Sequence, residues 1–442
     1  MVLPAPPHSV LIVGAGEFGA TTALALAEGP YRSSASLITV LDRGAQPPAE
    51  DAASSDYNKI VRADYSDPLY QAYALDAIAQ WRSPRWREHF HECGIVVGSH
   101  ESHPQAGYVR KSYQLNVDAD DASVEELREG ERLREFYPEG VELGTFPGHV
   151  AYKNNIGGWA ASRDAVVSAL DLSRALGVQC VCGEASTLLH TADGTDVRGV
   201  RLRDGRTLEA DIVILATGSW TPQLLPELAK NCLPTGQTVA TIQLTEEERI
   251  RYKDIPVSLF LDTGFYCFPP NPDGVFKMAI HDRGWLSPTG SLPSLPRTCL
   301  TAGYEAQEIP SCALEAIQRG LRAVYPELVD KEIKETRLCW YSDRESGDFL
   351  FDWHPKYRSL FVAAGGSGHA YKFLPLLGSW ILSSLQRSLP AHLAALWSFH
   401  GDKSRLDKSR GEGPIVRRDL DSGAVVEVRV PERDLEKIRA KL

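Results

Sequence analysis

Three glycines near the start of the chain have the spacing of a phosphate-binding turn. The segment VGAGEFG contains Gly14, Gly16 and Gly19 between a β-branched run and an alanine-rich run. Glycines at this spacing allow a tight turn, a close approach of the backbone to a pyrophosphate, and close packing of the following helix. Asp42 ends the next expected strand, where its carboxylate can accept a hydrogen bond from a ribose hydroxyl. These residues predict a dinucleotide-binding site.

The segment LEADIVILATGSWTP, residues 208–222, bears on which dinucleotide binds. It reads as a strand followed by a glycine turn, and it resembles the segment that flavoproteins place beneath their dinucleotide, with Gly218 allowing a close approach. The ordinary alternative is a buried strand that ends in a glycine turn. The resemblance favours FAD, and we assign four neighbouring side chains to the same site: Glu17, Phe18, Arg43 and Trp220.

Residues 337–378 place Cys339 ahead of a glycine cluster and a lysine, Lys372, inside an otherwise apolar run. A lysine in such a place must either reach the surface or pair with an anion. Gly366 and Gly368 can bring backbone N–H groups and a helix start close to a ligand, which favours negative charge there. A structural buried cysteine and a flexible turn are the ordinary alternatives, but a turn does not explain Lys372.

Length, charge and cysteine content indicate the number of domains, the kind of partner and the compartment to expect. A chain of 442 residues exceeds what one core usually fills, so we expect two domains. The formal net charge of −11 argues against nucleic acid or an anionic membrane as the main partner. The eight cysteines show neither a zinc spacing nor a dense disulfide framework, so we expect a reducing compartment and no metal site. We expect no secretory signal before the first strand, and no apolar run approaches the ~20 residues of a membrane span.

The periodicity of the chain predicts elements around these motifs. A strand, a glycine turn and a helix open the chain, and a strand, a glycine turn and a helix close it. Between them we expect a helix from Asp67 to about His91, irregular polar segments over 105–150, a helical pattern that resumes at Trp159, and a helix over 311–325.

Taken together, RLCWYSD, HPKYRSLFVAAGGSGHAYKFLPLLG and DYNKIVRADYSDP resemble the covalent flavoprotein amine oxidases. This family comprises monomeric sarcosine oxidase, L-pipecolate oxidase and fructosyl amino acid oxidase, and the resemblance covers essentially the whole length. It implies that Cys339 carries FAD through a thioether to the flavin 8α-methyl group, an 8α-S-cysteinyl link. It also implies that Gly366, Gly368 and His369 lie beside the flavin, and that Lys372 contacts both the flavin and the substrate carboxylate.

Lys59 and Arg62, three residues apart in YNKIVRADY, have two interpretations. The ordinary one is a solvated basic pair at a helix start. In the sarcosine oxidase branch, the residue matching Lys59 lies over the flavin and the residue matching Arg62 binds the substrate carboxylate, for which a planar guanidinium is suited. The resemblance thus implies a carboxylate clamp of Arg62 and Lys372. In fructosyl amino acid oxidases the position of Arg62 is often not basic, and the lysine matching Lys59 serves the sugar side.

The segment FKMAIHDRGW helps to choose a branch. Lys277 matches the lysine that this family uses near the flavin to activate oxygen, where a cation stabilises developing negative charge. Fructosyl amino acid oxidases carry a glutamate at the position of His281 and a smaller residue at the position of Tyr341, whereas the sarcosine-type enzymes resemble this chain. A surface histidine and a packed tyrosine are the ordinary alternatives.

The sequence therefore predicts an α/β fold, α+β overall. We expect a Rossmann-type FAD-binding domain of the D-amino-acid oxidase and glutathione reductase type, and a substrate domain with a mainly antiparallel sheet. The expected segments are 1–90, 150–225 and 338–400 for the FAD-binding domain, 91–149 and 226–337 for the substrate domain, and 401–442 for a charged, poorly packed tail.

The expected function is an FAD-dependent oxidase of the secondary amine of an N-substituted or cyclic amino acid. Sarcosine, L-pipecolate and saccharopine represent the expected substrates, with an imine and hydrogen peroxide as products. A fructosyl amino acid oxidase and a secondary-metabolite amine oxidase or cyclase stay open as alternatives. A flavoprotein without oxidase turnover and a dehydrogenase with a protein acceptor are further alternatives, against which Lys277 argues.

The final tripeptide, Ala440-Lys441-Leu442, is a variant of the Ser-Lys-Leu peroxisomal address. An enzyme that forms peroxide would share that compartment with catalase. We therefore expect recognition by the peroxisomal import receptor, with a cytoplasmic location as the alternative. The other expected partners are an amino-acid substrate and O2, and we expect a monomer.

Overall fold

The computed structural model describes most of the chain. The described residues are 2–3, 6, 8–305, 309–402, 404–406, 409–410, 417–423 and 425–426. The tripeptide Ala440-Lys441-Leu442 lies outside the described residues. None of the helices in the described part of the chain is both long and apolar enough to cross a membrane.

One half of the molecule is built on a six-stranded sheet in the order β20-β21-β13-β1-β2-β9. All neighbouring strands are parallel except β20, which runs antiparallel to β21. Short runs of β-branched and other apolar residues form the central strands, as expected for strands covered on both faces. The bounds are β1 Val10–Val13, β2 Ile38–Asp42, β9 Gln179–Cys182, β13 Ile212–Leu215, β20 Leu350–Trp353 and β21 Leu360–Ala364.

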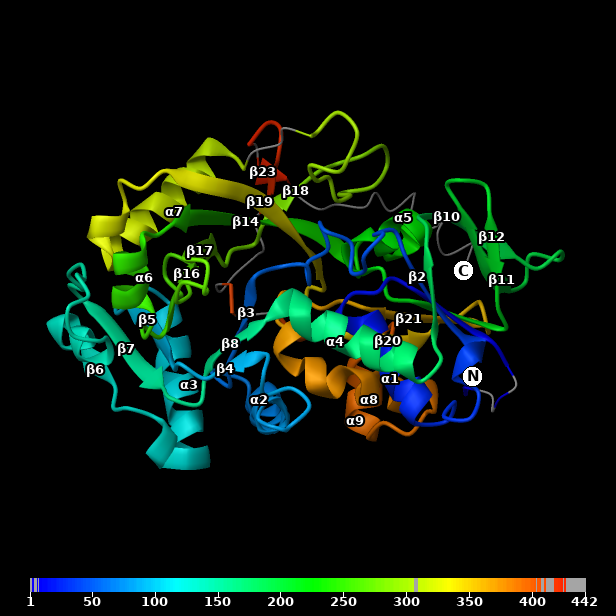
Figure 1. Ribbon diagram of the computed structural model, residues 1–442, viewed down its shortest axis with the longest axis horizontal. Helices are drawn as coiled ribbons and strands as arrows, with labels where there is room; N and C mark the ends of the chain where they lie inside the picture. Colours follow the sequence, from blue (N-terminus) through cyan, green and yellow to red (C-terminus); the bar gives the residue numbers. More distant parts are fainter. Residues whose placement is uncertain are drawn as a thin grey trace.

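Helices cover one face of this sheet and a small antiparallel sheet lies against the other. The first, α1 (Glu17–Glu28), packs between α4 (Ser162–Ala175) and α8 (Leu374–Leu385), and α2 (Pro68–Trp81) lies beside α8. In Figure 1, α1, α4 and α8 lie together in the lower middle of the view. The remaining elements of this half are α5 Thr221–Leu224, α9 Ala391–Leu396, β10 Ala185–His190, β11 Val197–Leu202 and β12 Thr207–Glu209.

The other half is an eleven-stranded, mainly antiparallel sheet, which confirms the predicted two-part fold. Its order is β23-β22-β18-β14-β17-β16-β15-β5-β7-β6, with β19 paired to β14, and only the β15–β5 and β18–β22 pairs are parallel. β5, β6 and β7 lie at the left of Figure 1. The strands are β5 Ile95–His100, β6 Arg128–Glu129, β7 His149–Asn154, β14 Leu233–Gln243, β15 Val257–Phe260, β16 Phe265–Cys267, β17 Val275–Ile280, β18 Trp285–Leu286, β19 Ile333–Asp343, β22 Arg417–Asp419 and β23 Val425–Val426, and the helices are α3 Gln105–Asp120, α6 Glu246–Tyr252 and α7 Ser311–Val324.

A three-stranded sheet, β3-β8-β4, is built from segments that alternate in sequence with strands of both large sheets, and it carries part of the site. Its strands are β3 Asn58–Val61, β4 Phe90–His91 and β8 Gly158–Ala161. Two strands run across the domain boundaries expected at 150 and 338. β7 stays with the antiparallel sheet because it pairs with β5, and β19 does so because it pairs with β14 along most of its length.

The structure corrects three expected elements. The helix expected to reach His91 ends at Trp81, because Pro84 restricts the preceding residue and stops helical continuation. Trp159 lies in β8, and α4 begins only at Ser162. The expected irregular segment contains the 16-residue helix α3, whose buried face includes Gln105, Ser112 and Asn116, so it lacks an apolar period.

The charged segment after Gly401 was expected to pack poorly, and this expectation is wrong for its described residues. Arg405 forms an ion pair with Asp67 at 2.5 Å, and Arg410 forms one with Asp343 at 2.6 Å. Strand β22 pairs with β18. Charged residues thus hold this segment in place through ion pairs rather than apolar burial, which explains why hydrophobic patterning missed it.

We predict opposite effects of alanine at two helical glycines. A Cβ at Gly19 would lie 1.8 Å from the Gly14 carbonyl oxygen, so Gly19→Ala should lower the free energy of unfolding by about 2 kcal/mol or more. Gly107, in α3, has no atom within 4 Å of such a Cβ. Gly107→Ala should therefore raise stability by up to ~1 kcal/mol. Urea-unfolding midpoints check both changes, and equal effects of the two variants would contradict the packing argument.

Candidate active site

The glycine turn after β1 excludes side chains at two of its three predicted positions. Gly14 has a φ of 103°, and a Cβ there would lie 2.4 Å from the Ala216 carbonyl oxygen at the end of β13. Gly19 is blocked by Gly14 itself. Gly16 is the N-cap of α1 and provides no side-chain cap, so the first N–H groups of this helix are left for another partner. This is the geometry of an anion site at a helix start.

A cavity runs along this turn, where the carboxyl ends of β1, β2 and β13 meet, together with the loop after β21. The edge at which parallel strands end is the usual ligand site of such sheets. Most residues predicted to bind the cofactor line this cavity: Gly14, Gly16, Glu17, Phe18, Asp42, Arg43, Lys59, Gly218, Trp220, Gly366 and Gly368.

Asp42 and Arg43 shape the far end of this cavity. Asp42 accepts hydrogen bonds from the backbone N–H groups of Ala15 and Gly44, both at 2.8 Å, so its carboxylate orders the turn as well as facing the cavity. The guanidinium of Arg43 lies 4.2 Å from the ring centroid of Trp220. Arg43 and Trp220 therefore form a flat wall of the cavity, and Asp42 adds a polar group beside it.

Cys339 lies on β19 directly behind the wall of this cavity. Its side chain is buried, and Sγ lies 3.5 Å from Lys59 Nζ and 4.0 Å from the Ala53 carbonyl oxygen. Ala53 and Lys59 line the cavity, as do the two residues after Cys339. The thiol therefore packs against residues that line the cavity.

Lys59 belongs to a buried chain of charges that the sequence analysis did not find. Asp56 accepts a hydrogen bond from Lys59 Nζ and another from Lys277 Nζ, each at 2.7 Å. Burial alone would raise the pKa of Asp56, but Lys277 and Lys59 hold it well below its ordinary value. Burial lowers the pKa of Lys277 to about 8, against the opposing effect of Asp56. Lys277 does not line this cavity. It is connected to the cavity wall through Asp56, which also holds Lys59.

A second cavity, of about 460 Å³, adjoins the first. The two share four lining residues: Lys59, Tyr341, Gly368 and Tyr371. A ligand in the second cavity would therefore face one in the first across these residues. The other predicted residues that line the second cavity are Arg62, His281, His369 and Lys372.

Arg62 is buried, with 6% of its surface exposed, and faces this second cavity. Its guanidinium lies 5.1 Å from the ring centroid of Tyr65. Within the described part of the chain, its Nη1 atom has no hydrogen-bond partner. Because an unpaired buried donor on a charged group is costly, an anion in the cavity is the partner that this geometry suits.

Lys372 is held by a hydrogen-bond chain through Tyr65, another residue that the sequence analysis missed. Lys372 Nζ donates to the Tyr65 hydroxyl and to the His369 carbonyl oxygen, both at 2.9 Å. His369 Nε2 lies 2.7 Å from the Gly347 carbonyl, which can only accept, so Nε2 carries a proton. Nδ1 then accepts from the Tyr65 hydroxyl at 2.9 Å when the imidazole is neutral. Lys372 and Arg62 thus share Tyr65.

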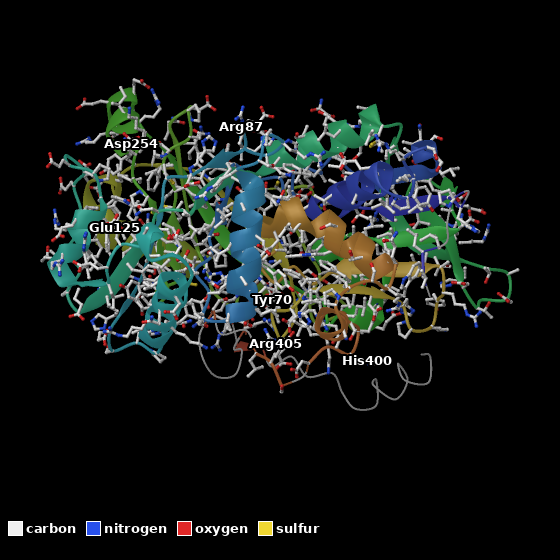
Figure 2. All side chains as sticks on the ribbon, turned by 90° about the horizontal axis from the view of Figure 1, so that it is seen from below. Tyr70, Arg87, Glu125, Asp254, His400 and Arg405 are labelled. Carbon is white, nitrogen blue, oxygen red and sulfur yellow. The ribbon has the colours of Figure 1, made fainter. Side chains whose placement is uncertain are left out.

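His281 and Tyr341 lie under the segment that follows α9. His281 Nε2 is 3.2 Å from Ser409 Oγ, and the Arg410 guanidinium lies 5.3 Å from the ring centroid of Tyr341. Arg405 lies beside the end of α2 that carries Tyr70 (Figure 2). This segment therefore forms part of the wall of the second cavity, a role for which the sequence contains no motif.

The parallel sheet and its glycine turn are those of a dinucleotide-binding protein, and a second cavity lined by Arg62 and Lys372 adjoins the first. Residues 9–383 match the model of the DAO family, FAD dependent oxidoreductase, and the chain belongs to this family. It is similar to L-saccharopine oxidase of Schizosaccharomyces pombe, with 30% identity over 89% of this chain and 94% of that protein.

Two further comparisons agree. Amino acid oxidase imqH of Aspergillus flavus is 28% identical over 91% of this chain and 99% of that protein. The crystal structure of the deglycating enzyme fructosamine oxidase (Amadoriase II) of Aspergillus fumigatus matches with a TM-score of 0.80 and 28% identity, over 96% of this chain and 98% of that one. The predicted family is confirmed, and the chain is an FAD-dependent oxidoreductase of the amine oxidase type.

Glu17 should make stability depend on pH. Burial raises its pKa from 4.5 to about 7, while Lys59 and Lys372 act in the opposite direction. Because the folded protein binds this proton more tightly than the unfolded chain, the contribution is full below about pH 4.5 and is lost as the pH rises through about 7. We expect the wild type to lose about 3 kcal/mol of its free energy of unfolding over this range, and Glu17→Gln to lack this loss.

Urea midpoints of the wild type and Glu17→Gln, measured across this range, check the prediction. Glu139→Gln, at an exposed glutamate, is the matched control and should follow the wild type. Parallel curves for the wild type and Glu17→Gln would show that Glu17 does not titrate as stated.

Proposed function

We propose that the protein is an oxidase of the secondary amine of an N-substituted or cyclic amino acid. The observation that carries the proposal is the pair Arg62 and Lys372, two buried cations joined through Tyr65 in the cavity next to the cofactor cavity. Together they suit a carboxylate, which a bidentate guanidinium and an ammonium can bind from two sides. The amino-acid oxidases and L-saccharopine oxidase among its relatives support this substrate class.

The first cavity fits FAD, because its glycine positions leave room for backbone contact with phosphates and the start of α1 is uncapped. When bound, FAD would supply an acceptor for the two electrons and the hydrogen of the C–H bond next to the amine nitrogen, and O2 with a second proton would then give hydrogen peroxide. The clamp of Arg62 and Lys372 would fix the substrate carboxylate so that the carbon next to nitrogen points toward the shared wall. Tyr341 and Gly368 form this wall.

The substrate must lose the proton on its amine before the C–N bond can be oxidised to an imine. His281 and Tyr341 line the cavity on the amine side of the proposed pose, where an imidazole could accept this proton. Lys277 would act on oxygen through Asp56 and Lys59 rather than by direct contact with the cavity. The ammonium of Lys59 lines both cavities and supplies positive charge at their junction.

We further propose that Cys339 holds FAD covalently as a thioether. Its support is the position of Sγ behind the wall of the first cavity, 3.5 Å from the Lys59 ammonium. Forming the bond replaces an S–H and a C–H bond by an S–C bond, and O2 can accept the two electrons and two protons released. Peroxisomal import through Ala440-Lys441-Leu442 stays a prediction that peroxide formation would favour.

A fructosyl amino acid oxidase is the second candidate, favoured by the overall similarity to Amadoriase II. His281 in the wall of the second cavity argues for the secondary-amine branch, as argued from the sequence. Peroxide release from sarcosine, L-pipecolate, saccharopine and a fructosyl amino acid, compared at one concentration in air, decides between them. Turnover of any of the first three supports the proposal, and turnover of the fructosyl compound alone overturns it.

The clamp makes a kinetic prediction. Arg62→Gln and Lys372→Gln should each lower kcat/KM roughly 100-fold or more, mainly through KM, because each removes a buried charge from the carboxylate. Arg62→Lys should have a kcat/KM between those of the wild type and Arg62→Gln, since it keeps the charge and loses the planar guanidinium. Steady-state kinetics on the best substrate of the panel check this. Arg132→Gln, at an exposed arginine, is the control, and a loss no larger than in the control would refute the clamp.

The thioether makes a chemical prediction. Acid precipitation of the wild type should leave the flavin with the protein, and intact mass should include FAD. Cys339→Ser should release the flavin into the supernatant, because a serine hydroxyl is a far weaker nucleophile than a thiolate. Cys312→Ser, at an exposed cysteine, should behave like the wild type. A yellow pellet from Cys339→Ser would assign the link elsewhere.

A further inference from the structure

The second cavity carries more positive charge than a single carboxylate requires. Five cationic side chains line it, whereas Asp67 is the one acidic residue among the described residues of its wall. The cations come from β3 and the residue after it, from α3, from the turn before α8 and from the segment after α9: Lys59, Arg62, Lys111, Lys372 and Arg405.

Two of these cations already have carboxylate partners. Lys59 pairs with Asp56 at 2.7 Å. Arg405 pairs with Asp67 at 2.5 Å and with Asp348 at 3.2 Å. Carboxylates of the protein therefore hold both side chains in place without an anion from a ligand.

Lys111 is different from both the paired cations and the buried clamp. It lies on α3 three residues after Tyr108, so the two side chains share one helix face. The Tyr108 hydroxyl donates to the Asp64 carbonyl oxygen at 3.1 Å, which holds this face of α3 against the cavity. Within the described part of the chain, Lys111 forms no ion pair and no side-chain hydrogen bond.

The position of Lys111 is at the opening of the cavity. Its side chain is exposed and yet lines the cavity, as does that of Leu406, which is 53% exposed. Gln105, at the start of the same helix, donates to the Ser409 carbonyl oxygen at 3.3 Å, so α3 and the segment after α9 border the cavity together. An unpaired ammonium thus stands at the mouth, while Arg62 and Lys372 lie buried inside.

Building on the proposed function, we propose that Lys111 binds a second carboxylate, carried by the nitrogen substituent of the substrate. The preferred substrate is then an N-substituted amino acid with at least two carboxylates. Its amino-acid carboxylate would lie in the clamp and the other at the mouth. A cavity of about 460 Å³ is far larger than an N-methyl amino acid needs. A neutral sugar substituent would gain no charge attraction from Lys111.

The test compares kcat/KM for saccharopine, which has a carboxylate on its nitrogen substituent, with kcat/KM for L-pipecolate, which has a single carboxylate. The wild type should favour saccharopine. Lys111→Gln should lower the ratio of the two values about fivefold, and Lys111→Glu about 20-fold or more, because it replaces attraction by repulsion. Lys111→Arg should keep the ratio, and added salt should lower the ratio in the wild type.

Lys253→Gln, at an exposed lysine that ends α6 and lines neither cavity, makes the same change in net charge and should leave the ratio unchanged. An unchanged ratio in Lys111→Glu, or a wild type that prefers L-pipecolate, overturns the inference and leaves the proposed function standing. Absence of peroxide from every secondary amine overturns the proposed function itself.

Discussion

A buried carboxylate at the junction of the two large sheets organises the site. Asp56 holds Lys277, from β17 of the antiparallel sheet, and Lys59, from β3, each at 2.7 Å. Lys59 in turn lies 3.5 Å from the thiol of Cys339. Without this carboxylate, the buried ammonium of Lys277 would keep the Asn58 carbonyl oxygen as a partner but no anion, a cost far above that of losing an exposed pair. The ion chain therefore keeps the antiparallel sheet, the thiol and the wall between the cavities in one arrangement.

The two cavities recognise their ligands by different means. The first depends on backbone: Gly14 and Gly19 exclude side chains by contact, and the start of α1 is left without a cap. Such a surface suits phosphates, which accept hydrogen bonds from N–H groups. The second depends on charged side chains held by a hydrogen-bond chain, in which Tyr65 connects Lys372 and His369. The first cavity is thus suited to the phosphates of a cofactor, and the second to a substrate chosen by its charge.

The wall that the two cavities share belongs to neither half alone. Tyr341 comes from β19 of the antiparallel sheet, whereas Gly368 follows β21 of the parallel sheet. A Cβ at Gly368 would lie 2.4 Å from the Tyr341 ring, so the two elements are packed as closely as their atoms allow. Any shift of one half against the other would change both cavities together, which ties substrate position to cofactor position.

The sequence by itself determined the local chemistry of this protein. The glycine spacing after β1 and the carboxylate that ends β2 depend only on neighbours along the chain, and they predicted the dinucleotide-binding fold. The resemblance of three segments, one of them around Cys339, predicted the family. The helix α3 was not predicted, because its buried face is partly polar and its sequence therefore shows no apolar period.

Only the tertiary structure decided which charges meet. Asp56 and Lys277 are 221 residues apart, Tyr65 and Lys372 are 307 apart, and Asp67 and Arg405 are 338 apart. No periodicity or spacing connects residues at such separations, because their contact depends on how the sheets pack and on where the chain returns after α9. The partners of the clamp, and the mouth of the cavity beside Lys111, follow from that packing.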